Sequence, residues 1–121
     1  MPVRTLPIAL AAALAALVLA ATGGAAAKPT LVGTVGPGFT IKVTMNGKAV
    51  KTLTAGAYTL VVHDKANIHN FHLLGPGANK VVTTVPFVGV KTVAVTLKKG
   101  TYTFQCDPHA AGGMKGTFTV T

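Results

Sequence analysis

The fold class is indicated by the stretch Phe39-Thr40-Ile41-Lys42-Val43-Thr44-Met45-Asn46-Gly47. Apolar and polar residues alternate over 39–45, which is the pattern of a half-buried β-strand. Asn46-Gly47 then supplies the two residues with positive φ that a two-residue type I′ hairpin turn requires. We therefore expect a β-hairpin whose return strand covers residues 48–53.

The rest of the chain after Pro29 continues this strand pattern. Short β-branched runs are separated by Gly, Pro and Asn, and no stretch shows the helical period of 3.6 residues. The further expected strands are 31–35, 58–62, 69–74, 92–97, 102–106 and 116–120. One flat sheet of about eight strands would leave an apolar face in water. The sequence therefore predicts an all-β fold, a two-sheet β-sandwich of about eight strands.

The first 27 residues have the pattern of a secretory signal peptide. Arg4 gives a positive start, residues 6–21 form a 16-residue apolar run, and Ala25-Ala26-Ala27 gives a small-residue exit. An uncleaved membrane anchor is the alternative, but a helix needs roughly 20 residues to span a bilayer. We expect 1–27 to be a signal peptide and 28–121 to be the single functional domain, with no stable membrane insertion after signal cleavage.

The composition argues against several classes of site. The 121 residues include 11 Lys+Arg against 2 Asp+Glu, for a formal net charge of +9. The single cysteine, Cys106, excludes an internal disulfide framework and any site that needs several thiolates from one chain. Asp64 and Asp107 are the only carboxylate side chains, which strongly disfavours two-carboxylate glycosidase chemistry and carboxylate-rich magnesium or calcium sites.

The positive charge of residues 28–121 comes from lysine alone. Nucleic-acid grooves and phosphate sites usually favour the planar guanidinium of arginine, and this range contains none. The lysines are also spread along the chain, so we expect no nucleic-acid partner. Such a spread is typical of a solvated surface, and electrostatic steering toward an acidic partner or an anionic cell envelope is the alternative.

A thiol, an imidazole and a thioether follow one another in the run Cys106-Asp107-Pro108-His109-Ala110-Ala111-Gly112-Gly113-Met114. Its connecting residues are largely Gly, Ala and Pro, so the loop can fold back and bring His109 and Met114 to Cys106. A lone cysteine in this place is most often a small buried hydrophobe. The spacing C-x2-H-x4-M instead favours a metal site.

A second imidazole is expected from residues 67–74. His69 shares its alternation with Phe71 and Leu73, whereas His72 has the opposite parity, so a strand over 69–74 would point His69 inward. We expect His72 at the surface, with an accessory role near the site as the alternative. His63 is not expected to be a ligand.

The four candidate ligands His69, Cys106, His109 and Met114 are two imidazoles, one thiolate and one weak thioether. This is the ligand set of a blue-copper electron-transfer site. Zinc fits less well, because structural zinc sites take several thiolates or imidazoles and have no use for methionine. We predict one copper ion that alternates between Cu(I) and Cu(II).

These motifs resemble those of the small secreted cupredoxins of the plastocyanin and pseudoazurin type. The resemblance covers residues 28–121 and is most specific at His69-Asn70 and at Cys106-x2-His109-x4-Met114. It implies a Greek-key β-sandwich of eight strands in which the first ligand is a His followed by Asn. In the family this Asn helps to tie the two ligand-bearing loops together. The residue after the Cys is usually Ser or Thr, whereas here it is Asp107, which can still bond to the Asn70 side chain.

The resemblance implies a type 1 copper protein that carries single electrons between redox protein partners in transient complexes. The Ala and Gly residues after His109 shield its ring poorly, so we expect electrons to leave there. We expect a monomer that is secreted, periplasmic or at the outer face of the cell envelope. The alternative function is a copper carrier, scavenger or delivery module, for which His63, His72 and Asp107 leave room; a metal-free structural sandwich is a third reading. No enzyme is expected, because the related nitrite reductases and multicopper oxidases need more copper sites and domains.

Overall fold

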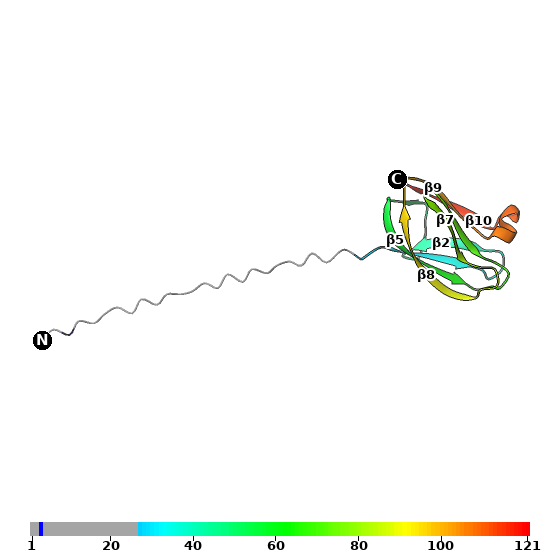
Figure 1. Ribbon diagram of the computed structural model, residues 1–121, viewed down its shortest axis with the longest axis horizontal. Coiled ribbons are helices and arrows are strands. Elements are labelled where there is room, and N and C mark those ends of the chain that lie inside the picture. The colour runs from blue at the N-terminus through cyan, green and yellow to red at the C-terminus, as the bar shows by residue number, and fades with distance from the viewer. Residues whose placement is uncertain (1–2, 4–26) are drawn as a thin grey trace.

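The computed structural model describes residue 3 and residues 27–121, so the predicted signal peptide lies almost wholly outside the described residues. Residues 27–121 form two five-stranded sheets (Figure 1). Sheet A contains, in spatial order, β3 (Lys48–Ala49), β2 (Ile41–Met45), β1 (Thr30–Val35), β5 (Gly56–Asp64) and β8 (Gly89–Leu97). Sheet B contains β4 (Thr52–Leu53), β10 (Lys115–Val120), β9 (Gly100–Gln105), β6 (Phe71–Gly75) and β7 (Ala78–Thr83). The prediction of an all-β two-sheet sandwich is therefore confirmed.

The chain changes sheet after β3, β4, β5, β7 and β8. Most neighbouring strands pair antiparallel, but β1 pairs with β5 and β10 pairs with β4 in parallel. Parallel neighbours need a long crossover connection. Here each of these connections includes at least one strand of the opposite sheet. Consecutive parts of the chain therefore pack on both sides of the core.

The predicted hairpin is confirmed at its turn and wrong in its return strand. Asn46 and Gly47 have φ values of 51° and 77°, as the type I′ turn requires. The return segment, however, forms two short strands in different sheets: β3 pairs with β2, and β4 pairs with β10. The chain passes from one sheet to the other at Val50 and Lys51, whose backbone groups bond to opposite sheets. A continuous alternating pattern does not reveal such a crossing.

The expected number of strands, about eight, is also corrected to ten in the described residues. Besides the divided return strand, the sequence reasoning missed β7, which forms a hairpin with β6. β7 is an edge strand whose residues 79–81 are exposed, so its apolar alternation is weak. The ligand run was expected to be a loop and contains one 3-10 helix, η1 (Asp107–Gly112).

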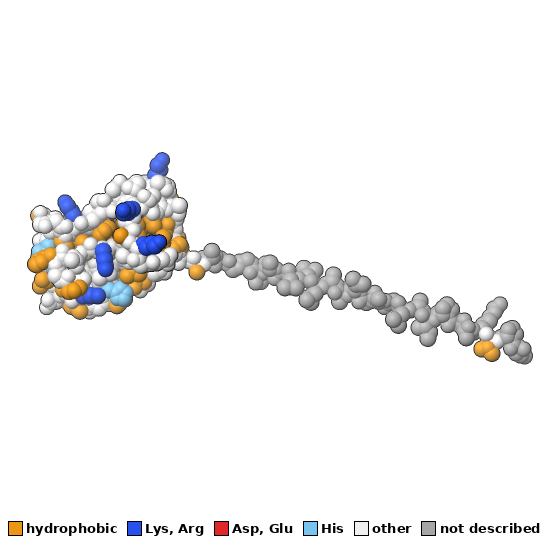
Figure 2. All heavy atoms as spheres, turned by 180° about the vertical axis from the view of Figure 1, so that it is seen from behind, with side chains coloured by type: hydrophobic (Ala, Val, Ile, Leu, Met, Phe, Trp, Pro, Cys, Tyr) orange, Lys and Arg blue, Asp and Glu red, His pale blue; other side chains and the backbone are white. Residues whose placement is uncertain are grey.

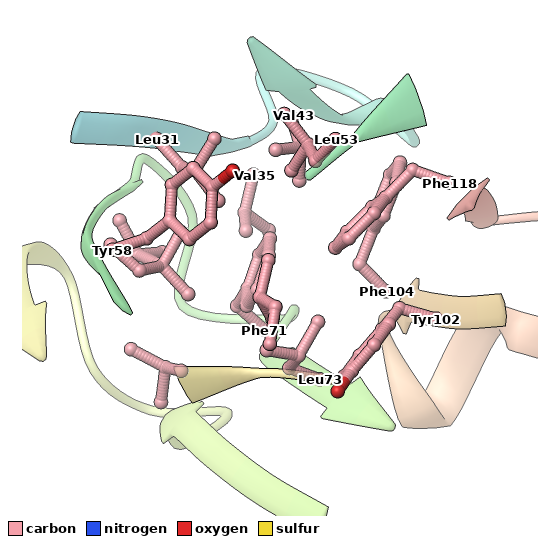
Figure 3. Packing of buried hydrophobic residues seen from close by; sticks show 14 of the residues in the cluster. Leu31, Val35, Val43, Leu53, Tyr58, Phe71, Leu73, Tyr102, Phe104 and Phe118 are labelled. Atoms are coloured by element: carbon pink, nitrogen blue, oxygen red, sulfur yellow. The ribbon is translucent and has the colours of Figure 1, made fainter. Parts of the chain in front are cut away.

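Aromatic rings from sheet B fill much of the core against aliphatic side chains from sheet A (Figure 3). Phe71 and Phe104 are stacked with centroids 6.2 Å apart, and Tyr102 stacks on Phe118 at 5.4 Å. Gly116 in β10 leaves room for this layer, because a Cβ there would overlap the Phe104 ring. The rigid aromatic layer fixes β6 and β9, the two strands beside the candidate ligands.

Three segments meet at one end of the sandwich, which we call the loop end: residues 36–40, 65–70 and 106–114. The register of sheet A places the last residues of β1 and β5 and the first residue of β8 at this end. Figure 1 shows η1, in orange, far from the C-terminus. Among the described residues, no helix is long and apolar enough to cross a bilayer.

Candidate metal centre

The candidate centre is formed by three side-chain atoms at the loop end, from His69, Cys106 and His109. The two imidazole Nδ1 atoms lie 3.0 Å apart, and the Cys106 Sγ lies 3.6 Å from that of His69 and 3.4 Å from that of His109. The point equidistant from three atoms with these separations is about 1.9 Å from each, close to a metal–imidazole bond length. One metal ion therefore fits between these three donors.

The ring of His69 is oriented by a loop far away in sequence. Its Nε2–H donates a hydrogen bond of 2.7 Å to the carbonyl oxygen of Gly38. Because a carbonyl can only accept, Nε2 carries the proton and Nδ1 presents its lone pair to the centre. Fixing the tautomer through the second ring nitrogen is the usual way in which a protein orients a histidine ligand.

The loop 36–40 contributes two features that the sequence reasoning missed. Besides the Gly38 carbonyl, it places the Phe39 ring edge-on to both imidazoles, with centroids 5.4 Å from His69 and 4.9 Å from His109. Phe39 was expected to begin a strand, but β2 starts at Ile41 and Phe39 is 66% exposed. The signal was the run Gly36-Pro37-Gly38, in which both glycines have positive φ and which therefore favours a turn before Phe39.

The ligand loop closes on itself through its backbone. The Cys106 N–H donates to the Met114 carbonyl at 3.0 Å, and the Met114 N–H donates to the His109 carbonyl at 3.2 Å. Pro108 lies in the first turn of η1, and Gly113 ends it with φ of 100°. Small residues thus allow the tight turn that the sequence indicated, and the backbone bonds hold the positions of His109 and Met114 relative to Cys106.

Met114, the predicted fourth ligand, follows η1 at the end of the ligand loop. Its side chain is 3% exposed. It lines a surface depression of about 330 Å³ together with Phe39, Pro108, His109, Gly112 and Gly113. Met114 as an axial ligand remains a prediction.

Asn70 joins the two ligand-bearing segments. Its Oδ1 accepts a hydrogen bond of 2.7 Å from the Asp107 N–H, and its Nδ2 donates to the Asp107 carboxylate at 2.9 Å. Asn70 is 4% exposed, so the Asn70 end of both bonds is shielded from water. Because Asn70 follows His69 and Asp107 follows Cys106, the pair fixes the spacing between two of the three donors. The contact implied by the family resemblance is therefore present, with Asp107 in the place of Ser or Thr.

His72 is not an isolated surface group, and the structure places it behind the centre. Its Nδ1 lies 2.9 Å from the Asp107 carboxylate and its Nε2 lies 2.6 Å from the Asn79 Oδ1. Burial acts to lower the pKa of His72, but the hydrogen bonds with Asn79 and Asp107 and the charge of Asp107 raise it above 6.5.

The pKa of Asp107 shifts in the opposite direction. Burial acts to raise the pKa of this carboxyl, but the hydrogen bond from Gln105, two further donors and the charge of His72 lower it below 3.8. The two groups therefore form an ion pair at weakly acidic pH, on the outer side of Cys106.

The structure brings His69 to the centre and leaves His72 outside it. The alternation of faces from which this was predicted is, however, wrong. Strict alternation of faces was expected over 69–74. Instead β6 begins at Phe71, the register shifts between Phe71 and His72, and His69, Asn70 and Phe71 are all buried in succession. His63 lies in β5 opposite Val90 and is not part of the three-residue group.

The chemistry of the donor set fits copper. Two imidazoles and one thiolate bind Cu(I) and Cu(II), and His69 and Cys106 are 1% and 0% exposed. His109 alone of the three is partly exposed. The centre therefore has a shielded interior and one edge near solvent.

Comparisons with known proteins agree with this donor set. The family model for copper binding proteins of the plastocyanin/azurin family matches residues 48–121. The plastocyanin of Daucus carota is 63% identical over 30 residues, covering 25% of this chain and 30% of the relative. Plastocyanin A/B of Petroselinum crispum is 61% identical over 31 residues, covering 25% and 32%. The chain thus spans about a third of the length of these curated relatives.

Copper proteins are also among the solved structures with similar folds. Rusticyanin aligns with a TM-score of 0.53 at 23% identity over 76% of each chain. Reduced auracyanin from Roseiflexus castenholzii has a TM-score of 0.53 at 21% identity, over 81% of this chain and 99% of its own. A multi-copper oxidase from Pediococcus acidilactici has a TM-score of 0.53 at 14% identity, over 84% and 28%. At these identities the structural matches show the fold alone.

The family model covers more than half of the chain and includes all four predicted ligand positions. His69, Cys106 and His109 form a type 1 copper-binding site for a single ion. The chain belongs to the plastocyanin/azurin family of copper binding proteins.

Proposed function

We propose that this protein is a secreted or periplasmic one-electron carrier that acts in transient complexes with redox proteins. The observation that carries the proposal is the uneven burial of the site: His69, Cys106 and Met114 are buried, and His109 is partly exposed. Bound copper supplies a Cu(II)/Cu(I) couple with which a protein can accept and give single electrons. The residues supply the shielding and the fixed positions.

Rigid support of the donors suits electron transfer. Gly38 orients His69, Asn70 links the two segments, and the ligand loop is closed by its own backbone bonds. Donors that are held in this way move little when the charge at the site changes, so little reorganisation opposes the transfer. An enzyme would instead need a position where a substrate can reach the metal, and the burial of three of the four predicted ligands argues against one.

His109 is the proposed exit point for the electron. Its ring edge borders the depression lined by Phe39 and by the glycines of the ligand loop. A partner that contacts this surface comes within one side chain of the copper site. Encounters of this kind bury little area and separate quickly, as a shuttle requires.

The copper-carrier alternative receives less support. A carrier must release its metal to a partner, and extra histidines beside the site would assist such a transfer. His72 instead binds Asp107 and Asn79, and His63 lies outside the group of donors. Location outside the cell rests on the N-terminal signal pattern and remains part of the proposal.

The test is the colour and reversibility of the copper-loaded protein. Addition of Cu(II) should give an intense absorption band at one copper per chain, which a mild reductant bleaches and an oxidant restores. Voltammetry should show a reversible one-electron wave. A bound copper that passes readily to a copper chelator, without a reversible wave, would favour the carrier instead.

Two matched variants test the residue assignment. Cys106→Ala should abolish the band because residues 1–121 contain no other thiol. His69→Ala should do the same, whereas His72→Ala, three residues away, should leave the band almost unchanged. An intense band in Cys106→Ala, or a loss of the band in His72→Ala alone, would refute the assignment.

A further inference from the structure

The loop end contains large apolar side chains that the fold does not bury, and one of them, Phe39, has its ring centroid 4.9 Å from that of His109. Four such residues are exposed at the loop end: Phe39 by 66%, Ile68 by 51%, Val88 by 58% and Val90 by 55%. Phe39 belongs to the loop 36–40, and Ile68 directly precedes His69. The two valines flank Gly89 at the start of β8. Several apolar side chains together at one end are typical of an interaction surface rather than of chance exposure.

Lysines surround this apolar surface. Four of them lie at or near the loop end by strand register: Lys42 beside the first pair of β1 and β2, Lys65 directly after β5, Lys91 near the start of β8, and Lys115 at the start of β10. All four are exposed. The Lys65 N–H also bonds to the Val35 carbonyl at 2.9 Å, which fixes that lysine beside the loop 36–40.

Carboxylate side chains do not neutralise these lysines. Asp64 is 2% exposed and points into the sandwich, and Asp107 is paired with His72 on the outer side of sheet B. These are the two acidic residues of the whole sequence. Figure 2 shows lysine side chains projecting from one face of the domain and no acidic side chain on that face. The field around the loop end is therefore positive.

We propose that the loop end docks an acidic protein surface, one in which carboxylates surround an apolar area next to the partner's own redox centre. The inference rests on the proposed electron-carrier function and names the chemistry of its partner. Lysines at the rim attract the carboxylates and raise the rate of encounter. The exposed Phe39 and Ile68 then form the close contact beside His109.

A protein partner fits these residues better than a membrane or a nucleic acid. The lysines lie on four separate strands or loops around an apolar centre, and a rim of charge around an apolar centre is the anatomy of protein interfaces. An anionic bilayer would attract the same charges but would bring no electron acceptor to His109. Arginine, which nucleic-acid sites favour, is missing from residues 28–121.

The experiment compares two double variants of the copper-loaded full chain with the same change in net charge. K42E/K65E alters the rim, and K98E/K99E alters two exposed lysines directly after β8, about 26 Å along that strand from Gly89 at the loop end. The Cu(II) band and the melting temperature establish that each variant keeps its site and fold. At 0.1 M salt the screening length is about 10 Å, so the distant pair has little influence at the loop end.

Stopped-flow rates are measured with three probes. The reduced protein gives one electron to hexacyanoferrate(III), an anion, or to tris(phenanthroline)cobalt(III), a cation. In the third reaction ferrous cytochrome b5, an acidic haem protein, gives one electron to the oxidised protein. K42E/K65E should slow the reactions with the two anionic probes by about tenfold and speed the reaction with the cationic one, while the rates of K98E/K99E stay within about twofold of those of the unmodified protein.

The outcomes separate this inference from the function on which it rests. If none of the three probes exchanges electrons with the protein, the electron-carrier function itself is wrong. If the probes react but both double variants change the rates equally, only net charge matters and the docking face is refuted. If K42E/K65E abolishes binding to vesicles of 30% phosphatidylglycerol without slowing cytochrome b5, a membrane replaces the acidic protein and the inference is overturned.

Discussion

Removal of the Asn70 side chain should destabilise the protein strongly, because Asn70 joins both ligand-bearing segments through two hydrogen bonds to Asp107. In Asn70→Ala the Asp107 N–H loses its 2.7 Å acceptor, and leaving such a partly buried donor unpaired costs about 1–3 kcal/mol. The bond to the carboxylate adds about 1 kcal/mol, less than is usual for a charged group, because the Asp107 side chain is 41% exposed and regains water.

The expected loss is therefore about 2–4 kcal/mol, or about 10–30 °C in melting temperature for a domain of this size. Thermal unfolding followed by circular dichroism, on the metal-free and the copper-loaded protein, measures it. Asn79→Ala is the matched control, because it removes only the bond to the outer ring nitrogen of His72 and should cost less than about 1 kcal/mol. A loss below about 1 kcal/mol in Asn70→Ala would mean that backbone bonds alone hold the ligand loop, and the reasoning would be refuted.

The remaining predictions concern the core, the axial position and pH. Gly116→Ala should lower the unfolding free energy by about 1–3 kcal/mol through overlap with a core phenylalanine ring, whereas Gly112→Ala, which has open space around it, should be tolerated; equal effects in urea unfolding would contradict this. Met114→Leu should keep the coloured band and raise the reduction potential, because loss of a weak donor destabilises Cu(II) more than Cu(I); an unchanged potential in voltammetry would mean that Met114 is not axial. The pair of His72 and Asp107 should contribute up to about 1 kcal/mol between pH 3.8 and 6.5, lost as pH rises through the raised pKa of His72 or falls through the lowered pKa of Asp107. His72→Gln should remove the difference in urea stability between pH 5.5 and pH 8.5.

The strands of the sandwich could largely be predicted because each has one buried and one exposed face. In β5 and β9 the buried and less buried residues alternate along the strand, which is the pattern that the sequence carries. Two features could not be predicted in this way. β7 lies at an edge and exposes three successive residues, 79–81, and the return segment after Gly47 divides between two sheets. In both cases the deciding contacts are with strands distant in sequence, so local alternation carries no information about them.

The three donors His69, Cys106 and His109 were predictable from residue type and spacing, whereas their orientation was not. Parity favoured His69 over His72. However, the adjacent residues His69 and Asn70 are both buried, so faces do not alternate here and parity alone does not identify the ligand. The structure separates the two histidines by their partners instead. The Gly38 carbonyl fixes the ring of His69, and Asp107 with Asn79 fixes the ring of His72. The first contact joins residues 31 positions apart, and no pattern within 67–74 indicates it.

The surroundings of Asp107, the carboxylate beside Cys106, could not be predicted from local sequence either. They change the expected influence of Asp107 on the reduction potential. In the linear sequence Asp107 is an uncompensated negative charge next to a thiolate, which would lower the reduction potential by stabilising Cu(II). The fold surrounds this carboxylate with donors: Asn70 and Gln105 each donate to one of its oxygens, and the His72 Nδ1 lies within 3.0 Å of both. Below the raised pKa of His72, the imidazolium also offsets the charge. We therefore expect the influence of Asp107 on the potential to be small at pH 5.5 and larger at pH 8.5, and a potential that is the same at both values in the unmodified protein would show that the carboxylate does not act on the copper site.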